Sequence, residues 1–251
     1  MRDESILIRR SIALESVGQG AVAARLEDNF HHFGVRVAYE GGKVTDLATG
    51  ALRFPWTTCP AAGASLRAAI GEPLSDRPEK LAEKLPMQLN CTHMFELGAL
   101  AIRHASLRDR GELAEDQRID MVIRESAEDR TVLSGTYEVN GQRLLDMTVE
   151  GSVIASPERN AGRDLYERFR PWLATLPADE ATMLWLMRRA FWLAAGYQVY
   201  KPRAFAGEND LGPVCYTYQP ERKDIAAAID RSVIDVRDLD YRILDQAMIF
   251  A

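Results

Sequence analysis

Residues 33–54, FGVRVAYEGGKVTDLATGALRF, decide the fold that the sequence predicts. Large apolar residues alternate with smaller or polar ones through the first part, at Phe33, Val35, Val37 and Tyr39. This two-residue period is typical of a strand with one buried face. Glu40-Gly41-Gly42-Lys43 has the composition of a hairpin turn, so a return strand is expected from Val44 to Phe54. The segment therefore predicts part of an antiparallel meander.

Similar strand patterns lie on both sides of this hairpin. Upstream, Ile6, Ile8, Ile12 and Leu14 alternate with polar neighbours. Downstream, β-branched or alternating runs cover Arg118–Arg124, Thr131–Val139 and Arg143–Ile154, with the type I′ turn signal Asn140-Gly141 between two of them. A second antiparallel group is therefore expected.

Helical patterns interrupt and follow the strands. The sequence predicts helices over Pro60–Ile70, Pro78–Leu85, Thr92–Ser106, Arg163–Leu176, Asp179–Gly196 and Arg222–Arg231. The Asp179–Gly196 helix has a broad apolar surface, which indicates either deep core or a homodimer contact. The predicted fold class is α+β, with an antiparallel sheet or partly closed barrel in the first two thirds, helices packed on it and a helical C-terminal third. Residues 1–251 are expected to form one domain.

Composition narrows the function. The chain has 251 residues, 47% of them hydrophobic, and a net charge of −6, which argues against a nucleic-acid partner. Its three cysteines lack the spacing of a disulfide framework or a zinc ribbon, which indicates reduced thiols in a cytoplasm. The charged N-terminus and the short apolar run behind it predict neither a signal peptide nor a membrane span.

The richest chemistry lies in Asn90-Cys91-Thr92-His93-Met94-Phe95-Glu96, where an extended segment is expected to become an amphipathic helix capped by Thr92. The free N–H groups of a first helical turn favour a neutral imidazole and a thiolate. His93 is therefore a candidate general base, and Glu96, one turn along, is placed to hold its ring. The alternative is that the imidazole only caps its helix. His104 lies near a charged helix end and is expected to be solvated.

A second cluster is Asp28-Asn29-Phe30-His31-His32-Phe33. On a strand the two adjacent imidazoles point to opposite faces, so only one of them enters a given cavity. Alternation places His31 on the face of Phe33 and Val35, where Asp28 can orient it, although a satisfied core histidine has the same pattern. With His93 and a carboxylate, His31 or His32 could complete a metal triad, but the four histidines lack metal-ligand spacing, and no metal or organic cofactor is predicted.

Two further clusters suit a flat ligand. Arg53-Phe54-Pro55-Trp56-Thr57-Thr58-Cys59-Pro60 puts a cation, an indole and a thiol at a strand-to-helix junction. Cys215-Tyr216-Thr217-Tyr218-Gln219-Pro220 carries two phenols on one face, and either can donate a hydrogen bond or carry a proton. A buried thiol at Cys59 and simple packing of Tyr216 and Tyr218 are the structural alternatives.

These clusters carry a family resemblance. The Asp-x-x-His-His motif from Asp28, the Arg-x-Pro-Trp-x-x-Cys-Pro motif from Arg53, the Cys-Thr-His motif from Cys91 and the segment from Cys215 resemble, in order and spacing, the bacterial family catalogued as domain of unknown function 2889. The likeness runs from about Arg10 to Arg231. It departs at Asn90 and Met94, where the family usually has Gly and Leu. The resemblance implies an association with the catabolism of lignin-type aromatic dimers, in which cofactor-free lyases release formaldehyde.

The leading hypothesis is therefore a cofactor-independent lyase for a small phenolic dimer, working by general acid and base catalysis. Its candidate catalytic residues are His93, His31, His32, Arg53 and Tyr218. Its candidate substrate-binding residues are Asp28, Phe30, Trp56, Cys59, Cys91, Thr92, Glu96 and Tyr216. Two alternatives stay open: a non-catalytic binding or regulatory protein that uses the same aromatic residues, and a thiol enzyme in which Cys91 is the nucleophile.

Overall fold

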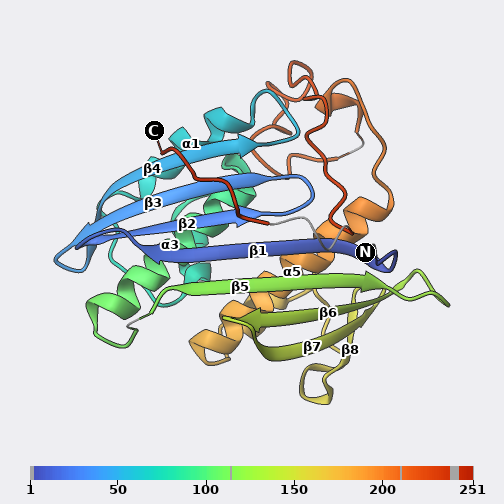
Figure 1. The fold of residues 1–251 in the computed structure, drawn as a ribbon, viewed down its shortest axis with the longest axis horizontal. Coiled ribbons are helices and arrows are strands. Elements are labelled where there is room, and N and C mark those ends of the chain that lie inside the picture. The colour runs from blue at the N-terminus through green and yellow to red at the C-terminus, as the bar shows by residue number, and fades with distance from the viewer. Residues whose placement is uncertain (1–2, 114, 210, 238–242, 251) are drawn as a thin grey trace. The chain divides into compact units, whose positions relative to one another are not determined.

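The chain has an α+β fold with an open antiparallel sheet, as a computed structural model that describes residues 3–113, 115–209, 211–237 and 243–250 shows (Figure 1). Unit 1 comprises Met1–Ser11, Arg118–Tyr200 and Asp235–Ile243, and unit 2 comprises Ile12–Gln117, Lys201–Ile234 and Leu244–Ala251. Hydrogen-bonded strands follow the order β4-β3-β2-β1-β5-β6-β7-β8, and β1 (Ile6–Ser16) contributes residues to both units. The sheet is not closed into a barrel.

Unit 2 is built on the predicted meander. Strands β2 (Ala21–Glu27), β3 (His32–Glu40) and β4 (Lys43–Arg53) pair antiparallel, and Glu40 to Lys43 closes the hairpin as expected. The long helix α3 (Thr92–Asp109) packs against β2 and β3 (Figure 1). Phe33, Val35 and Val37 are completely buried, so the alternation did mark the inner face of β3.

Helix α3 differs from the predicted amphipathic helix. Every residue from Thr92 to Ser106 is buried, including His104, which was expected to be solvated. The helix begins at Thr92 and has Cys91, not Thr92, at its N-cap position. Over this stretch the helix is buried on all sides and has no polar face, and only its last turn, with Arg108 and Asp109, reaches the surface.

The other helical pieces of unit 2 are short. The predicted Pro60–Ile70 helix is divided into η1 (Cys59–Ala62), α1 (Gly63–Leu66) and η2 (Arg67–Ala69). The predicted Pro78–Leu85 helix is divided into η3 (Pro78–Lys80) and α2 (Leu81–Lys84). Two further turns are η4 (Met87–Leu89) and η6 (Ala206–Glu208).

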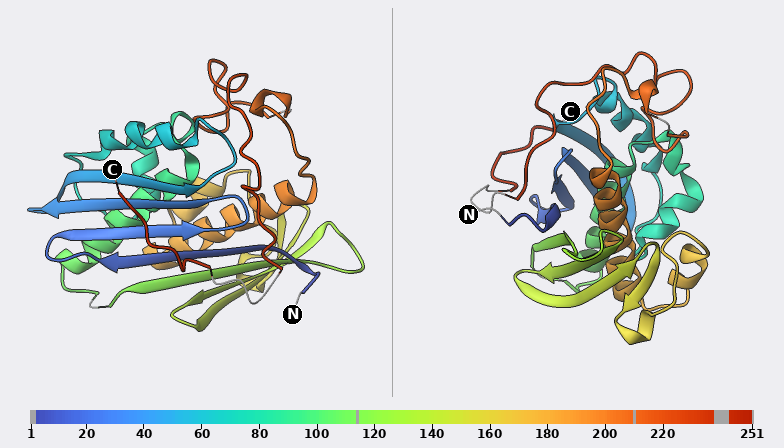
Figure 2. Two further views of the ribbon diagram at one scale, coloured as in Figure 1. Left: turned by 45° about the horizontal axis from the view of Figure 1, so that its top comes forward. Right: turned by 90° about the vertical axis from the view of Figure 1, so that its right-hand side faces the viewer.

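The C-terminal segment 243–250 crosses the face of β3 and β4 opposite α3 (Figure 2). Gly34 and Gly50 are partners across these strands, and a Cβ atom on either would lie within 3.0 Å of the Met248 side chain. The missing side chains therefore make room for the segment. The Leu244 N–H donates a hydrogen bond of 2.6 Å to Glu27, which fixes the start of the segment.

Unit 1 contains strands β5 (Gln117–Glu125), β6 (Val132–Val139), β7 (Gln142–Glu150) and β8 (Val153–Ser156). Asn140 and Gly141 both have positive φ, at 50° and 79°, so the predicted type I′ signal lies at the turn between β6 and β7. After β8 the chain forms η5 (Glu158–Asn160), α4 (Phe169–Leu173) and the long helix α5 (Ala178–Gln198). Helix α5 packs on β6.

Several predicted boundaries were wrong. The expected strand Arg143–Ile154 is two strands, because the chain reverses at Gly151 with a φ of 61°. The expected helix Arg163–Leu176 is reduced to α4, since Arg168 has a left-handed φ of 52° at its N-cap. Residues 222–231 form no helix: Ala227 and Ala228 instead make β-bridges with Phe205 and Trp56, a tertiary pairing that local composition does not encode.

Strand β2 was not predicted, because its alanines give little periodic signal. The single domain stays a prediction. In the part of the chain that the structure describes, no helix combines the length and apolarity needed to cross a membrane.

Candidate acid–base site

The hairpin loop between β2 and β3 is the foundation of the site. The Asp28 N–H donates to the His31 carbonyl at 2.9 Å, which closes the loop. The Asp28 Oδ1 atom accepts the N–H groups of Phe30 and His31, both at 2.9 Å. An aspartate side chain that accepts hydrogen bonds from the backbone N–H groups two and three residues further on replaces the backbone hydrogen bonds that would continue a strand. Asp28 therefore ends β2 and holds the loop in one conformation.

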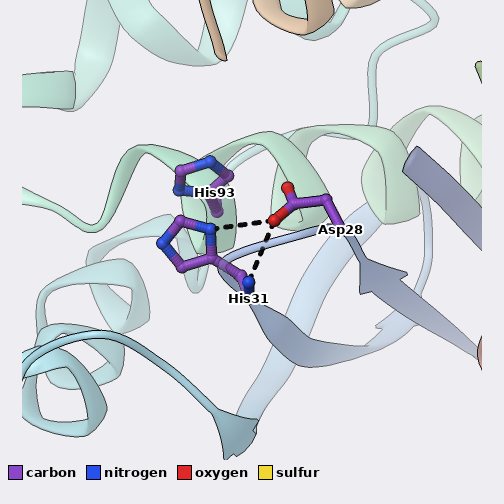
Figure 3. Close-up of side chains that lie close together, drawn as sticks. All are labelled: Asp28, His31 and His93. Atoms are coloured by element: carbon purple, nitrogen blue, oxygen red, sulfur yellow. Dashed lines mark hydrogen bonds and ion pairs between the residues drawn. The ribbon is translucent and has the colours of Figure 1, made fainter. Parts of the chain in front are cut away.

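The same carboxylate orients an imidazole. His31 Nδ1 lies 3.2 Å from Asp28 Oδ1, and the His31 ring stacks on the His93 ring with 3.8 Å between centroids and 30° between planes (Figure 3). His93 belongs to the first turn of α3. Asp28 is completely buried, whereas His31 and His93 keep 8% and 7% of their surface exposed. All three side chains of the cluster are therefore buried, the carboxylate most completely.

This arrangement is suited to proton transfer. When Nδ1–H donates to a carboxylate, the opposite nitrogen Nε2 carries the lone pair and becomes the base. The stack holds a second imidazole, His93, 3.8 Å from His31. Two imidazoles held side by side suit a reaction that needs one base and one acid.

Arg53, expected as a catalytic cation, instead holds the loop. Its Nη1 donates to the carbonyl oxygens of Asn29 and Ser232, both at 2.9 Å. Its Nη2 donates to the Asp28 carbonyl at 2.5 Å and the His31 carbonyl at 3.3 Å, and it pairs with Glu27 at 3.2 Å. Both Nη atoms of Arg53 thus donate to carbonyl oxygens, and Nη2 also pairs with a carboxylate. The structure places Arg53 behind the loop as a positioning group.

His32 lies on the other side of β3 from His31. Its Nδ1 is 3.6 Å from Glu27 Oε2, and the side chain is 1% exposed. Burial, the largest cause, lowers the pKa of His32, and the carboxylate of Glu27 opposes that effect. Strand alternation left open which of the two histidines joins His93, and the structure assigns His31.

The Arg53–Pro60 motif and the Cys215–Pro220 motif contact each other in unit 2. Trp56 and Tyr218 form an edge-to-face pair with 6.3 Å between ring centroids. Thr217 links the segments, since its hydroxyl lies 2.9 Å from Thr58 Oγ1 and 3.6 Å from Cys59 Sγ. The Tyr216 N–H donates to the Asn90 carbonyl at 2.9 Å, which brings this segment to the start of α3. Segments 56–59, 90–93 and 215–218 therefore gather although they are far apart in sequence.

Neither of the two buried thiols that were predicted as site residues is activated. Burial raises the pKa of Cys59 to about 12. Burial likewise raises the pKa of Cys91 far above its usual range, with the neighbouring Cys59 and Cys215 as smaller causes. The expectation that a helix start would favour a thiolate at Cys91 was wrong, because loss of water outweighs the helix dipole.

The remaining predicted residues have simpler surroundings. Phe30 tilts against His31 at 6.1 Å, Thr92 and Glu96 are buried in the first turns of α3, and the Tyr216 ring lies under the Arg222 guanidinium at 3.9 Å. In the described part of the chain, the group of close potential metal ligands is Asp28, His31 and His93, so Asp28, and not Glu96, is the carboxylate of that cluster. Phe33, which lies 5.2 Å from His31 and 6.4 Å from His93, was noted only as core, and Thr217 was noted only as part of its motif.

Fold and site together define an α+β protein with a buried aspartate–histidine–histidine cluster at a hairpin loop. Comparisons with protein-family models, curated proteins and solved structures return no match for this chain.

Proposed function

We propose that this protein is a cofactor-independent lyase that releases formaldehyde from the hydroxymethyl side chain of a phenolic aromatic dimer. The observation that supports it is the His31–His93 stack oriented by Asp28, which provides a base and a proton store in one place. The substrate class comes from the family resemblance.

The reaction moves two protons, one from the phenol to the benzylic hydroxyl and one from the hydroxymethyl group to the phenolate, with no net change in oxidation state. Removal of the phenol proton and departure of a protonated benzylic hydroxyl as water give a quinone methide. Removal of the hydroxymethyl proton then breaks the carbon–carbon bond. Its electron pair forms the new double bond and restores the phenolate, and the carbon leaves as formaldehyde.

In this proposal, His31 takes the hydroxymethyl proton, because its hydrogen bond to Asp28 leaves the opposite nitrogen basic. His93 takes the phenol proton and delivers it to the benzylic oxygen, which leaves as water, and the proton that His31 takes returns to the phenolate. Trp56 and Tyr218 lie on the neighbouring segments and offer apolar surface for the aryl rings. Arg53 and Glu27 position the loop without touching the reacting atoms.

The test uses the metal-stripped full chain and hydroxymethyl-bearing phenolic dimers, with formaldehyde and the absorbance of the conjugated product as readouts. We expect turnover that falls about 10²- to 10⁴-fold in His31→Gln and in His93→Gln. His104→Gln is the matched control, since this histidine is also buried in α3 but outside the cluster. A dimer with a methylated phenol should not react.

Failure has two forms. A thermal shift with these dimers but no formaldehyde would replace the lyase by the binding protein. No response to any dimer would remove the proposed substrate class.

A further inference from the structure

We propose that Asp28, His31 and His93 form a binding site for one divalent transition-metal ion of the zinc class. This inference goes beyond the proposed lyase, because it concerns a metal-bound state of the cluster, whereas the lyase reaction uses the metal-free state. One ligand atom from each side chain lies within 4.8 Å of the other two, and all three residues are buried.

Two of the ligands already have a suitable separation. Metal–nitrogen and metal–oxygen bonds of about 2.1 Å at right angles place the two donor atoms about 3.0 Å apart. Asp28 Oδ1 and His31 Nδ1 are 3.2 Å apart. The separation of these two atoms is therefore already close to what one shared metal ion requires, on a loop that Arg53 holds.

The third ligand needs one defined movement. An imidazole binds a metal in its own ring plane, and the planes of His31 and His93 are only 30° apart in the stack. One ion cannot lie in both planes until the rings separate at one edge. Rotation of the His93 side chain at the start of α3 achieves this, so metal binding is expected to open the stack (Figure 3).

The donor set selects the kind of ion. Two imidazoles and one carboxylate suit Zn²⁺, Co²⁺ or Fe²⁺, whereas Mg²⁺ and Ca²⁺ prefer oxygen ligands throughout. The Asp28 carboxylate would offset part of the charge of the ion.

Calorimetry of the metal-stripped chain with Zn²⁺, without any substrate, tests this directly. We expect one ion per chain and affinity that falls about 100-fold or more in His93→Gln and in Asp28→Asn. His104→Gln should bind as the unaltered chain does. Because Asp28 also holds the loop, thermal unfolding of each variant without metal checks the fold, and Zn²⁺ should raise the melting temperature only where the cluster is complete.

Co²⁺ gives a second readout that identifies the ligands. Nitrogen and oxygen ligation gives weak visible bands, whereas thiolate ligation adds an intense near-ultraviolet band. Absence of binding, unchanged affinity in His93→Gln, or a thiolate band would overturn the proposal. None of these measurements depends on turnover, so a failed lyase assay leaves the metal site standing, and a failed titration leaves the lyase standing.

Discussion

Units 1 and 2 each lay one long helix on antiparallel strands, yet they fill the space between helix and strands differently. In unit 1, Met187 and Phe191 of α5 pack against Gly135 of β6, where a Cβ atom would lie 2.7–2.8 Å from their side chains. In unit 2, α3 buries four titratable side chains, those of His93, Glu96, Arg103 and His104, whereas α5 buries one, that of Arg189. All four histidines of the chain belong to unit 2.

The difference separates what a fold requires from what a site requires. Apolar packing gives stability without a desolvation cost, whereas a buried titratable group must be compensated by hydrogen bonds or charge. A fold of this type therefore does not need the polar groups of α3. Such groups concentrate where chemistry is done, which is why the proposed activity is assigned to unit 2.

The largest expected effect concerns two aspartates that build similar turns. Asp28 in unit 2 and Asp164 in unit 1 each accept two backbone N–H groups from the residues that follow. Asp28→Asn should lower kcat about 10²- to 10⁴-fold, because an amide does not hold Nδ1–H of His31 as a carboxylate does. Asp164→Asn is the control and should leave kcat unchanged. Equal losses of kcat in the two variants would mean that the effect comes from disturbing an aspartate turn and not from removing the carboxylate that holds His31.

The second prediction uses the acid sensitivity of α3. Burial lowers the pKa of His104 to about 4, from an unfolded value of about 6.5. Between these values the unfolded chain binds more protons, so stability falls as the pH decreases from 6.5 to 4. His104 alone should account for about 2 kcal/mol between pH 7 and pH 5.

Urea unfolding of the protein and of His104→Leu at both pH values checks this. The variant should lose most of that difference and retain the part due to His32, whose pKa burial also lowers. An unchanged pH dependence in His104→Leu would show that His104 is not a source of the acid sensitivity.

Strands in both units could be predicted from the sequence, but the assembly of the site in unit 2 could not. Alternation over residues 33–39 and the Asn140-Gly141 turn fixed strands correctly, because both are local signals. His31, His93 and Asp28 were all named, but their union depends on packing between a hairpin loop and a helix more than sixty residues further along. The role of Arg53 depends on four carbonyl groups that no motif displays.

The third prediction strains the apolar interface of unit 1. Gly135→Ala places a methyl group against Ile123, Met187 and Phe191, and should destabilise the protein by roughly 1 to 2 kcal/mol. Gly196→Ala, in α5 but with open space around it, should instead stabilise by about 0.5 to 1 kcal/mol. Urea unfolding at one pH measures both. A neutral Gly135→Ala would mean that the interface yields easily and is not closely packed.

The smallest effect is expected at Cys91, at the N-cap of the helix that carries His93. A fully buried thiol with a raised pKa is a packing group, so Cys91→Ala should cost about 1 kcal/mol of stability and change kcat less than about twofold. In the native protein Cys91 should also react with iodoacetamide far more slowly than the half-buried Cys215. Loss of turnover in a folded Cys91→Ala variant would restore the thiol enzyme and remove His31 from its central role. Retained turnover would leave acid–base catalysis by His31 and His93 as the chemistry that sets unit 2 apart from unit 1.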